Sequence, residues 1–202
     1  MNSFVKSVKV FFPVFLLSIS LSACALWGKR STPQDAGIIY GPGFALSLMA
    51  PQGWYIDEQT GKRHGLLAVI LPENQTWNTA KTRIYSSVAF FDSVMNTPAA
   101  VLQKDTTYFH SAGSDVSISP IDTLMDANGR VSFSYEVTGM PQEPYKIITY
   151  IPENKVMILL GMGAASKDLY RKTLPQYQQV VLSYTFFTQR TKFLSPKQFN
   201  GD

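Results

Sequence analysis

The chain of 202 residues contains a single cysteine, Cys24. With one thiol no intramolecular disulfide can form, so a folded domain of this chain has to be held together by its apolar core. Hydrophobic residues make up 45% of the sequence and aromatic residues 13%, which is ample for the core of a domain of ordinary size. The sequence therefore predicts a fold stabilised by packing, with Cys24 left for another use.

Residues 1–23 have the pattern of a secretory signal. Lys6 and Lys9 give a basic start, and a short apolar run follows at 10–19. This run is shorter than the ~20 apolar residues that a membrane-spanning helix needs. We expect cleavage after residue 23. The alternatives are an uncleaved anchor, or an ordinary signal followed by a chance cysteine.

The residues that end this signal, Leu21-Ser22-Ala23-Cys24, resemble the lipobox of bacterial lipoproteins. The resemblance implies transfer of a diacylglyceryl group to the sulfur of Cys24, cleavage before it, and acylation of the new N-terminus. Two or more acyl chains hold a protein stably on a bilayer. In Gram-negative lipoproteins an Asp after the cysteine resembles an inner-membrane retention signal, and Ala25 stands there instead. Cys24 is thus the predicted lipidation site, with the periplasmic face of the outer membrane as the predicted location.

The mature chain divides into three parts. Residues 24–38 are polar and rich in Ser, Thr, Pro and Gly, which is typical of a flexible tether. Residues 39–190 suit one domain, and 191–202 form a loose tail. The whole chain has 18 Lys and Arg against 14 Asp and Glu, and two of the lysines leave with the signal. This near balance gives no electrostatic case for a nucleic-acid partner.

Alternating apolar and polar residues predict a series of short strands. In the clearest of them Phe133 and Tyr135 alternate with Ser132 and Ser134, after an Asn128-Gly129 pair that is typical of a tight hairpin. Expected strands lie at 44–49, 54–56, 66–71, 83–91, 116–124, 130–138, 145–151 and 156–160, with a polar loop at 57–65.

Two helices interrupt these strands. Thr97 and Pro98 form a good N-cap and first position for a helix that should end near residue 112. A second helix follows from the 4-3-4-3 spacing of apolar residues between Tyr170 and Tyr184, with a kink or break at Pro175. Strands mixed with packed helices predict an α+β domain, an antiparallel β-sheet flanked by helices.

Several of these segments together resemble the PsbP/Mog-like α/β/α sandwich, which includes bacterial lipoproteins of the DcrB kind. The resemblance lies in the strand 44–48 running into the turn 51–54, a central helix, strands at 145–150 and 155–161, and a final stretch at 177–186. It covers roughly residues 40–187. It implies a scaffold for protein partners: photosystem assembly in plastids, a small GTPase in the nucleus, and envelope roles in bacteria. It implies no catalytic residue.

Few residues are candidates for chemistry. The Gly161-to-Ser166 segment stands where a dinucleotide fingerprint would lie, but Ser166 replaces its third glycine, so we expect a turn at Gly163 and a helix N-cap at Ser166. His64 and His110 are the only histidines, and we place them on a solvated loop and near a helix end rather than at a metal. For Glu136 we expect a solvent-facing side chain, with a groove between sheet and helix as the alternative. We expect no catalytic residue, no cofactor and no metal.

Three functions remain open. The first is a non-enzymatic envelope lipoprotein that binds or assembles with another envelope protein, held to the membrane by the lipid on Cys24. The second is a hydrolase-like periplasmic enzyme whose polar residues, His64 and His110 among them, meet only in three dimensions. The third is a binder of lipid or a small ligand between sheet and helix, which needs an apolar cavity of ~300–1,000 Å³. We favour the first.

Overall fold

The computed structural model describes residues 36–113, 115–125 and 131–188 of the chain. These belong to one compact unit, which begins at Gln34. The predicted signal, Cys24, most of the predicted tether, the tail 191–202 and the Asn128-Gly129 pair lie outside the described residues. Among the residues that are described, no helix has the length and hydrophobicity needed to cross a membrane.

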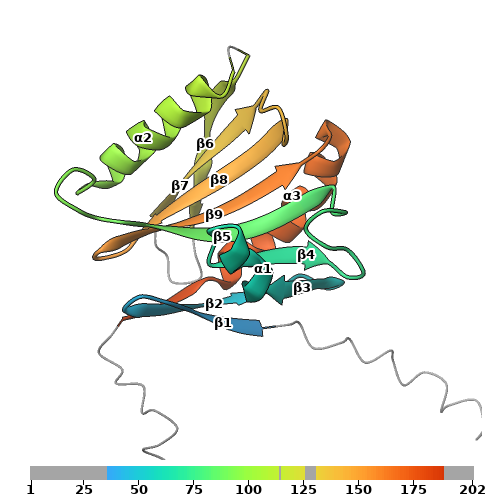
Figure 1. Cartoon of the computed structure of the whole chain (residues 1–202), viewed down its shortest axis with the longest axis horizontal. Coiled ribbons are helices and arrows are strands. Elements are labelled where there is room, and N and C mark those ends of the chain that lie inside the picture. Colours follow the sequence, from blue (N-terminus) through green and yellow to red (C-terminus); the bar gives the residue numbers. More distant parts are fainter. Residues whose placement is uncertain (1–35, 114, 126–130, 189–202) are drawn as a thin grey trace, which may run out of the picture. The chain divides into compact units, whose positions relative to one another are not determined.

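Ten strands form two antiparallel sheets (Figure 1). The large sheet has the order β3-β4-β5-β9-β8-β7-β6, and the small sheet has the order β1-β2-β10. The large sheet consists of β3 (Trp54–Asp57), β4 (Ala68–Pro72), β5 (Thr82–Phe90), β6 (Ser117–Met125), β7 (Val131–Thr138), β8 (Tyr145–Pro152) and β9 (Val156–Ala164). The small sheet consists of β1 (Ala36–Gly41), β2 (Phe44–Met49) and β10 (Thr185–Thr188). The predicted α+β fold, an antiparallel sheet flanked by helices, is confirmed.

Three helices accompany the sheets: α1 (Glu58–Arg63), α2 (Pro98–Ser111) and α3 (Lys167–Ser183). Both predicted helix starts are confirmed, because the Thr97 hydroxyl accepts the Ala100 N–H at 3.2 Å and the Ser166 hydroxyl accepts the Leu169 N–H at 3.3 Å. Pro175 lies inside α3, so the helix does not break there.

The α3 face of the large sheet carries the main core. Tyr177, Val180 and Val181 of α3 are fully buried in one cluster with residues of β5, β8 and β9 and with the inner side chains of the small sheet. The amphipathic spacing predicted for this helix therefore points at the sheet, as the burial of an apolar stripe requires. Figure 1 shows α3 behind the large sheet.

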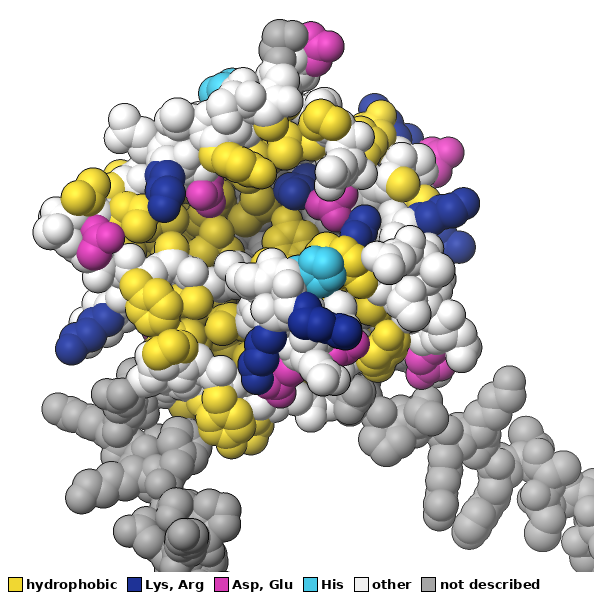
Figure 2. Space-filling view, in the orientation of Figure 1, with side chains coloured by type: hydrophobic (Ala, Val, Ile, Leu, Met, Phe, Trp, Pro, Cys, Tyr) yellow, Lys and Arg dark blue, Asp and Glu magenta, His cyan; other side chains and the backbone are white. Residues whose placement is uncertain are grey.

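The opposite face, the α2 face, is covered only in part. Val101 and Phe109 of α2 pack with residues of β7, β8 and β9 at one end of the sheet. At the other end a separate small cluster lies under Trp77 in the loop between β4 and β5. Figure 2 shows this face as a hollow with a hydrophobic floor and charged side chains at its rim.

Three elements differ from the sequence-based expectation. β1 takes in residues 36–38, which we had placed in the tether, and only Ile39 of this strand is fully buried. α1 lies within the predicted polar loop; it forms because the Asp57 side chain caps it by accepting the Thr60 N–H at 2.8 Å. β10 pairs with β2 directly after α3, where no separate strand was expected.

Candidate functional site

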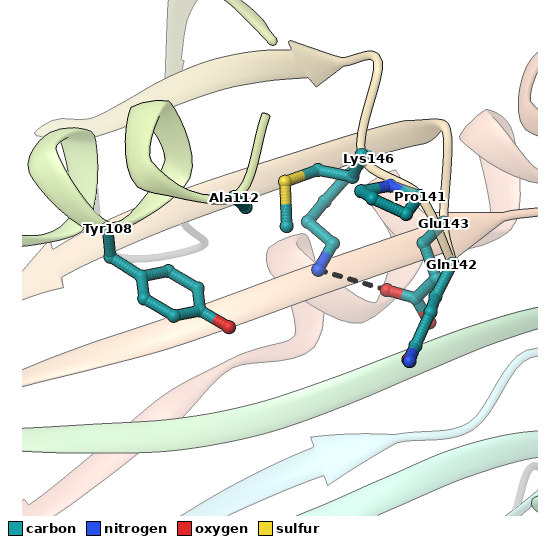
Figure 3. Close-up of a pocket in the computed structure, with 7 residues that line it drawn as sticks. Tyr108, Ala112, Pro141, Gln142, Glu143 and Lys146 are labelled. Atoms are coloured by element: carbon teal, nitrogen blue, oxygen red, sulfur yellow. Dashed lines mark ion pairs between the residues drawn. The ribbon is translucent and has the colours of Figure 1, made fainter. Parts of the chain in front are cut away.

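A pocket of about 280 Å³ lies on the α2 face. It is bounded by the C-terminal part of α2 on one side and by the loop between β7 and β8 on the other (Figure 3). Its lining residues are Tyr108, Ala112, Met140, Pro141, Gln142, Glu143 and Lys146. The pocket thus combines an exposed aromatic ring, an apolar loop and a pair of opposite charges.

Two charged residues that line the pocket, Glu143 and Lys146, form a small network with Arg83 of β5. The ammonium of Lys146 lies 3.0 Å from the carboxylate of Glu143, and Nε of Arg83 lies 3.5 Å from the same carboxylate. The three side chains are only 14–21% exposed. One carboxylate therefore serves two cations, and the network keeps a net charge of +1.

Two glycines of β9 make room for this network. A Cβ at Gly163 would overlap the carboxylate of Glu143, and a Cβ at Gly161 would overlap the ring of Tyr85. Both glycines lie inside the strand, on the face from which Lys146 projects, so the turn that we predicted at Gly163 is wrong. Their role is to let side chains lie flat on the sheet, a common use of glycine in a strand interior.

Burial and neighbouring groups together shift the pKa values of Tyr85 and Lys146 at this site. It raises the pKa of the Tyr85 phenol, although Lys146 acts in the other direction, so Tyr85 is neutral at pH 7. Burial alone would lower the pKa of Lys146, but its interactions with Tyr85 and Glu143 outweigh that effect and raise the pKa. Lys146 is therefore a permanent cation near neutral pH.

Trp77 extends the site along the sheet. The guanidinium of Arg83 lies 4.6 Å from the centre of the Trp77 ring and donates to the Trp77 carbonyl at 3.3 Å. The imidazole of His64, at the end of α1, stacks on the same indole at 4.0 Å between ring centres. These contacts hold Arg83 in place beside Glu143.

Two contacts fix the walls of the pocket. The hydroxyl of Tyr150 on β8 donates to the carboxylate of Asp105 on α2 at 2.8 Å, which ties the helix to the sheet. Gly139, which opens the β7–β8 loop, has a φ of +86° and lies so close to the backbone of Asp115 that a Cβ would overlap it. The loop therefore begins against the segment that joins α2 to β6, at a position that only glycine fills without strain.

The residues singled out from the sequence do not come together. His64 and His110 are exposed and lie on different helices, and the described part of the chain has no group of three or more potential metal ligands. Glu136 is half-buried on the α3 face, where its charge and a hydrogen bond add to the effect of burial in raising the pKa of Tyr170. Its expected solvent-facing position is wrong, because the side chain lies beside Tyr170 of α3 and is only partly exposed.

Sequence reasoning missed the charged network. Arg83, Glu143 and Lys146 come from β5, the β7–β8 loop and β8, and no local motif links them. One signal was present: Gly161 and Gly163 share a face of a buried strand, which indicates close approach of other side chains. The identity of those side chains depends on strand order and register.

Comparison with known proteins gives structural relatives alone. No protein-family profile matches the chain, and no curated protein sequence matches it. The structure is similar to that of PsbP (CyanoP) from Synechocystis sp. PCC 6803, with a TM-score of 0.50 and 13% identity over 79% of this chain and 97% of that chain.

Two further structures were found. LpqN from Mycobacterium tuberculosis, described as involved in cell envelope biogenesis, has a TM-score of 0.51 and 12% identity over 78% of this chain and 94% of that chain. A variant of the protein Mog1 has a TM-score of 0.46 and 12% identity over 81% of this chain and 100% of that chain. At such low identity the similarity to PsbP and LpqN shows the fold alone, and it confirms the predicted PsbP-like architecture.

Proposed function

We propose that this chain is a lipid-anchored protein of the bacterial cell envelope that binds a segment of another envelope protein in the pocket beside α2, without catalysing a reaction. The observation that carries the proposal is the pocket, which is lined by both the poorly exposed cation Lys146 and the exposed ring of Tyr108. Tyrosine is enriched among the residues that contribute most to binding in protein interfaces, and a cation at low solvent exposure attracts a partner's carboxylate more strongly than one in open water.

The chemistry of the pocket favours an acidic partner segment. Arg83 and Lys146 share the single carboxylate of Glu143, so an incoming Asp or Glu would find uncompensated positive charge at low solvent exposure. Tyr108, Met140 and Pro141 offer apolar surface next to it. The segment that fits presents a carboxylate beside an apolar side chain.

The state of the charged groups supports binding over catalysis. A lysine that acts as a nucleophile or base needs a lowered pKa, whereas the pKa of Lys146 is raised. The carboxylate of Glu143 lies within ion-pair distance of two cations, Arg83 and Lys146. The hydrolase alternative therefore finds no support at this pocket.

The size of the pocket bears on the small-ligand alternative. Its volume is about 280 Å³, just below the ~300–1,000 Å³ of typical ligand sites. Part of its lining is charged. One or two partner side chains fill such a space better than a lipid or a whole ligand does.

The envelope location is supported by two observations of different kinds. The Leu21-to-Cys24 sequence resembles a lipobox, and one structural neighbour, LpqN, is described as involved in cell envelope biogenesis. Mass spectrometry of the native protein tests the anchor: we expect a mature terminus at Cys24 that carries acyl mass. A terminus at residue 24 without it would contradict the anchor.

Site-specific photocrosslinking in cells tests the pocket. A crosslinker at Tyr108 is expected to capture one envelope protein, through a segment that carries Asp or Glu beside an apolar residue. The control is a crosslinker at Gln178, exposed on α3 on the other side of the sheet. Lys146→Met should abolish the adduct while leaving a cooperative thermal transition. Equal adducts from both positions, or an adduct that survives Lys146→Met, would overturn the proposed binding site.

A further inference from the structure

The outer face of the small sheet carries several exposed apolar side chains around the polar pair Ser47 and Thr185. Side chains alternate between the two faces of a strand, so Ile38 and Tyr40 of β1 point away from the core that Ile39 enters. Met49 of β2 and Phe187 of β10 share this outer side by the strand register. Their exposed fractions are 51% for Ile38, 55% for Tyr40, 39% for Met49 and 37% for Phe187.

The strand register makes these residues one continuous surface. Tyr40 and Phe187 both pair with Ala45, one from each side. Ala45 lies on the outer face and yet has no exposed area, because the side chains of its two neighbours close over it. Four of the ten large hydrophobic side chains exposed in the described part of the chain lie on this three-stranded sheet. Such a concentration marks an interaction surface.

The position of this face in the chain indicates what covers it. β1 begins at Ala36, twelve residues after Cys24. Fully extended, such a segment reaches at most about 40 Å, and as a flexible coil it spans roughly 20 Å. If Cys24 carries lipid, β1 therefore begins within about 40 Å of the bilayer.

The sequence segments next to β1 and β10 carry a net positive charge, which is the sign that an anionic lipid surface attracts. Lys29 and Arg30 lie shortly before β1, and Arg190, Lys192 and Lys197 lie shortly after β10. Against them stand Asp35 and Asp202 in the same segments. Basic residues beside an apolar, tyrosine-bearing surface suit an anionic lipid headgroup layer. Two copies of this face would instead bring like charges together.

We infer that the outer face of the small sheet docks on an anionic lipid surface, with Tyr40 and Phe187 at the level of the headgroups. The inference rests on the proposed anchor for its geometry. The docking also gives the anchored domain an orientation. The α2 face and its pocket lie on another side of the domain and stay accessible to a partner. Binding through this face should weaken with salt, because screening shortens the reach of surface charge.

A chain that starts at residue 24 with Cys24→Ser tests the inference without any acyl group. Residues 1–23 lie outside the compact unit, so their removal leaves it whole. Flotation with vesicles of phosphatidylethanolamine and phosphatidylglycerol is compared with flotation with pure phosphatidylcholine. We expect binding to the anionic vesicles alone, and at least a tenfold loss in the Tyr40→Ser/Phe187→Ser variant.

The matched control is Val94→Ser/Phe133→Ser, which removes two exposed hydrophobic side chains that lie outside the small sheet. It should leave vesicle binding unchanged, and both variants should keep the thermal transition of the parent. Equal losses in the two variants would overturn the inference. A different result would be a dimer that forms without vesicles and is lost only in the Tyr40→Ser/Phe187→Ser variant. That result would overturn the inference and show that the face binds a second copy of the chain.

A second measurement, of spin-label accessibility, tests whether the outer face of the small sheet contacts the bilayer in the lipid-anchored protein. A spin label at Tyr40→Cys should be accessible to oxygen and shielded from a polar nickel reagent, whereas a label at Tyr108→Cys should show the reverse. Polar accessibility at both positions would overturn the docking. Native protein without acyl mass, together with vesicle binding by the Cys24→Ser chain, would overturn the anchor and support the docking surface.

Discussion

The hydroxyl of Tyr177 on α3 lies 2.6 Å from the hydroxyl of Thr149 on β8 and donates to the carbonyl of Leu160 on β9 at 2.8 Å. Thr149 in turn lies 2.9 Å from the hydroxyl of Ser134 on β7. All of these side chains are buried. A polar chain thus runs across three strands under the helix, inside an apolar core.

Tyr177→Phe should be destabilising although it keeps the ring. The change removes both bonds of the phenol and leaves the carbonyl of Leu160 without that partner, in a place that solvent does not reach. Such a loss costs about 1–3 kcal/mol in the free energy of unfolding. Denaturant unfolding measures it, and a midpoint equal to that of the parent would show that the network adds no stability.

Ser86→Ala, unlike Tyr177→Phe, should not lower the free energy of unfolding. The hydroxyl of Ser86 is buried and has no hydrogen-bond partner among the described residues. Removing an unpaired buried hydroxyl should be neutral or stabilising by up to about 1 kcal/mol. Ser134→Ala is the matched control, because that hydroxyl is bonded to Thr149. A larger loss for Ser86→Ala than for Ser134→Ala in thermal unfolding would contradict this description.

Gly163→Ala should disrupt the charged network. The new methyl group would overlap the carboxylate of Glu143, and overpacking of this kind costs about 1–3 kcal/mol. Gly113→Ala, where the nearest atom is 3.8 Å away in Val116, should stay within about 0.5 kcal/mol of the parent.

A double-mutant cycle identifies the source of that cost. Glu143→Ala removes the atoms that the new methyl group meets, so Gly163→Ala should cost less in that background than in the parent chain. Unfolding free energies of the four proteins give the coupling between the two positions. Additive costs would place the effect of the alanine elsewhere in β9.

Asp105→Asn should change how stability depends on pH. Burial raises the pKa of Asp105 above 3.8, although its hydrogen bond from Tyr150 acts in the other direction. The folded state then holds this proton more tightly than the unfolded state, so stability falls as the pH rises from 3.8 through the raised pKa.

The asparagine variant keeps an acceptor for Tyr150 and lacks this titration. We expect it to be more stable than the parent at neutral pH and to match the parent more closely at pH 4. Melting temperatures across this pH range measure the difference. A constant gap between the two proteins would contradict the raised pKa.

The sequence predicted the elements whose signals are local. α2 and α3 begin where Thr97 and Ser166 stand, because an N-cap acts through its own neighbours. β1 escaped prediction because only one of its side chains is fully buried, and α1 because a polar helix of six residues has no apolar stripe. Gly163 was assigned to a turn because its neighbours across the sheet were unknown.

The pocket could not be predicted from the sequence either, because its charged residues are neighbours only in the folded sheet. Arg83 and Lys146 stand on different strands and meet one carboxylate, Glu143, only after β5, β9 and β8 pair in the observed order. Strand order is decided by packing across the whole sheet. The α+β class required no such knowledge, because it follows from the kinds and sequence of the elements.

The pairing of β2 with β10 also governs when this protein can finish folding. Ser47 of β2 pairs with Thr185 of β10. β2 is synthesised early and β10 late, so the small sheet is completed only after most of the chain has been made. Contacts of such long sequence separation form late and slowly. Until β10 has formed, β2 therefore has one unpaired edge, to which another chain can add a strand.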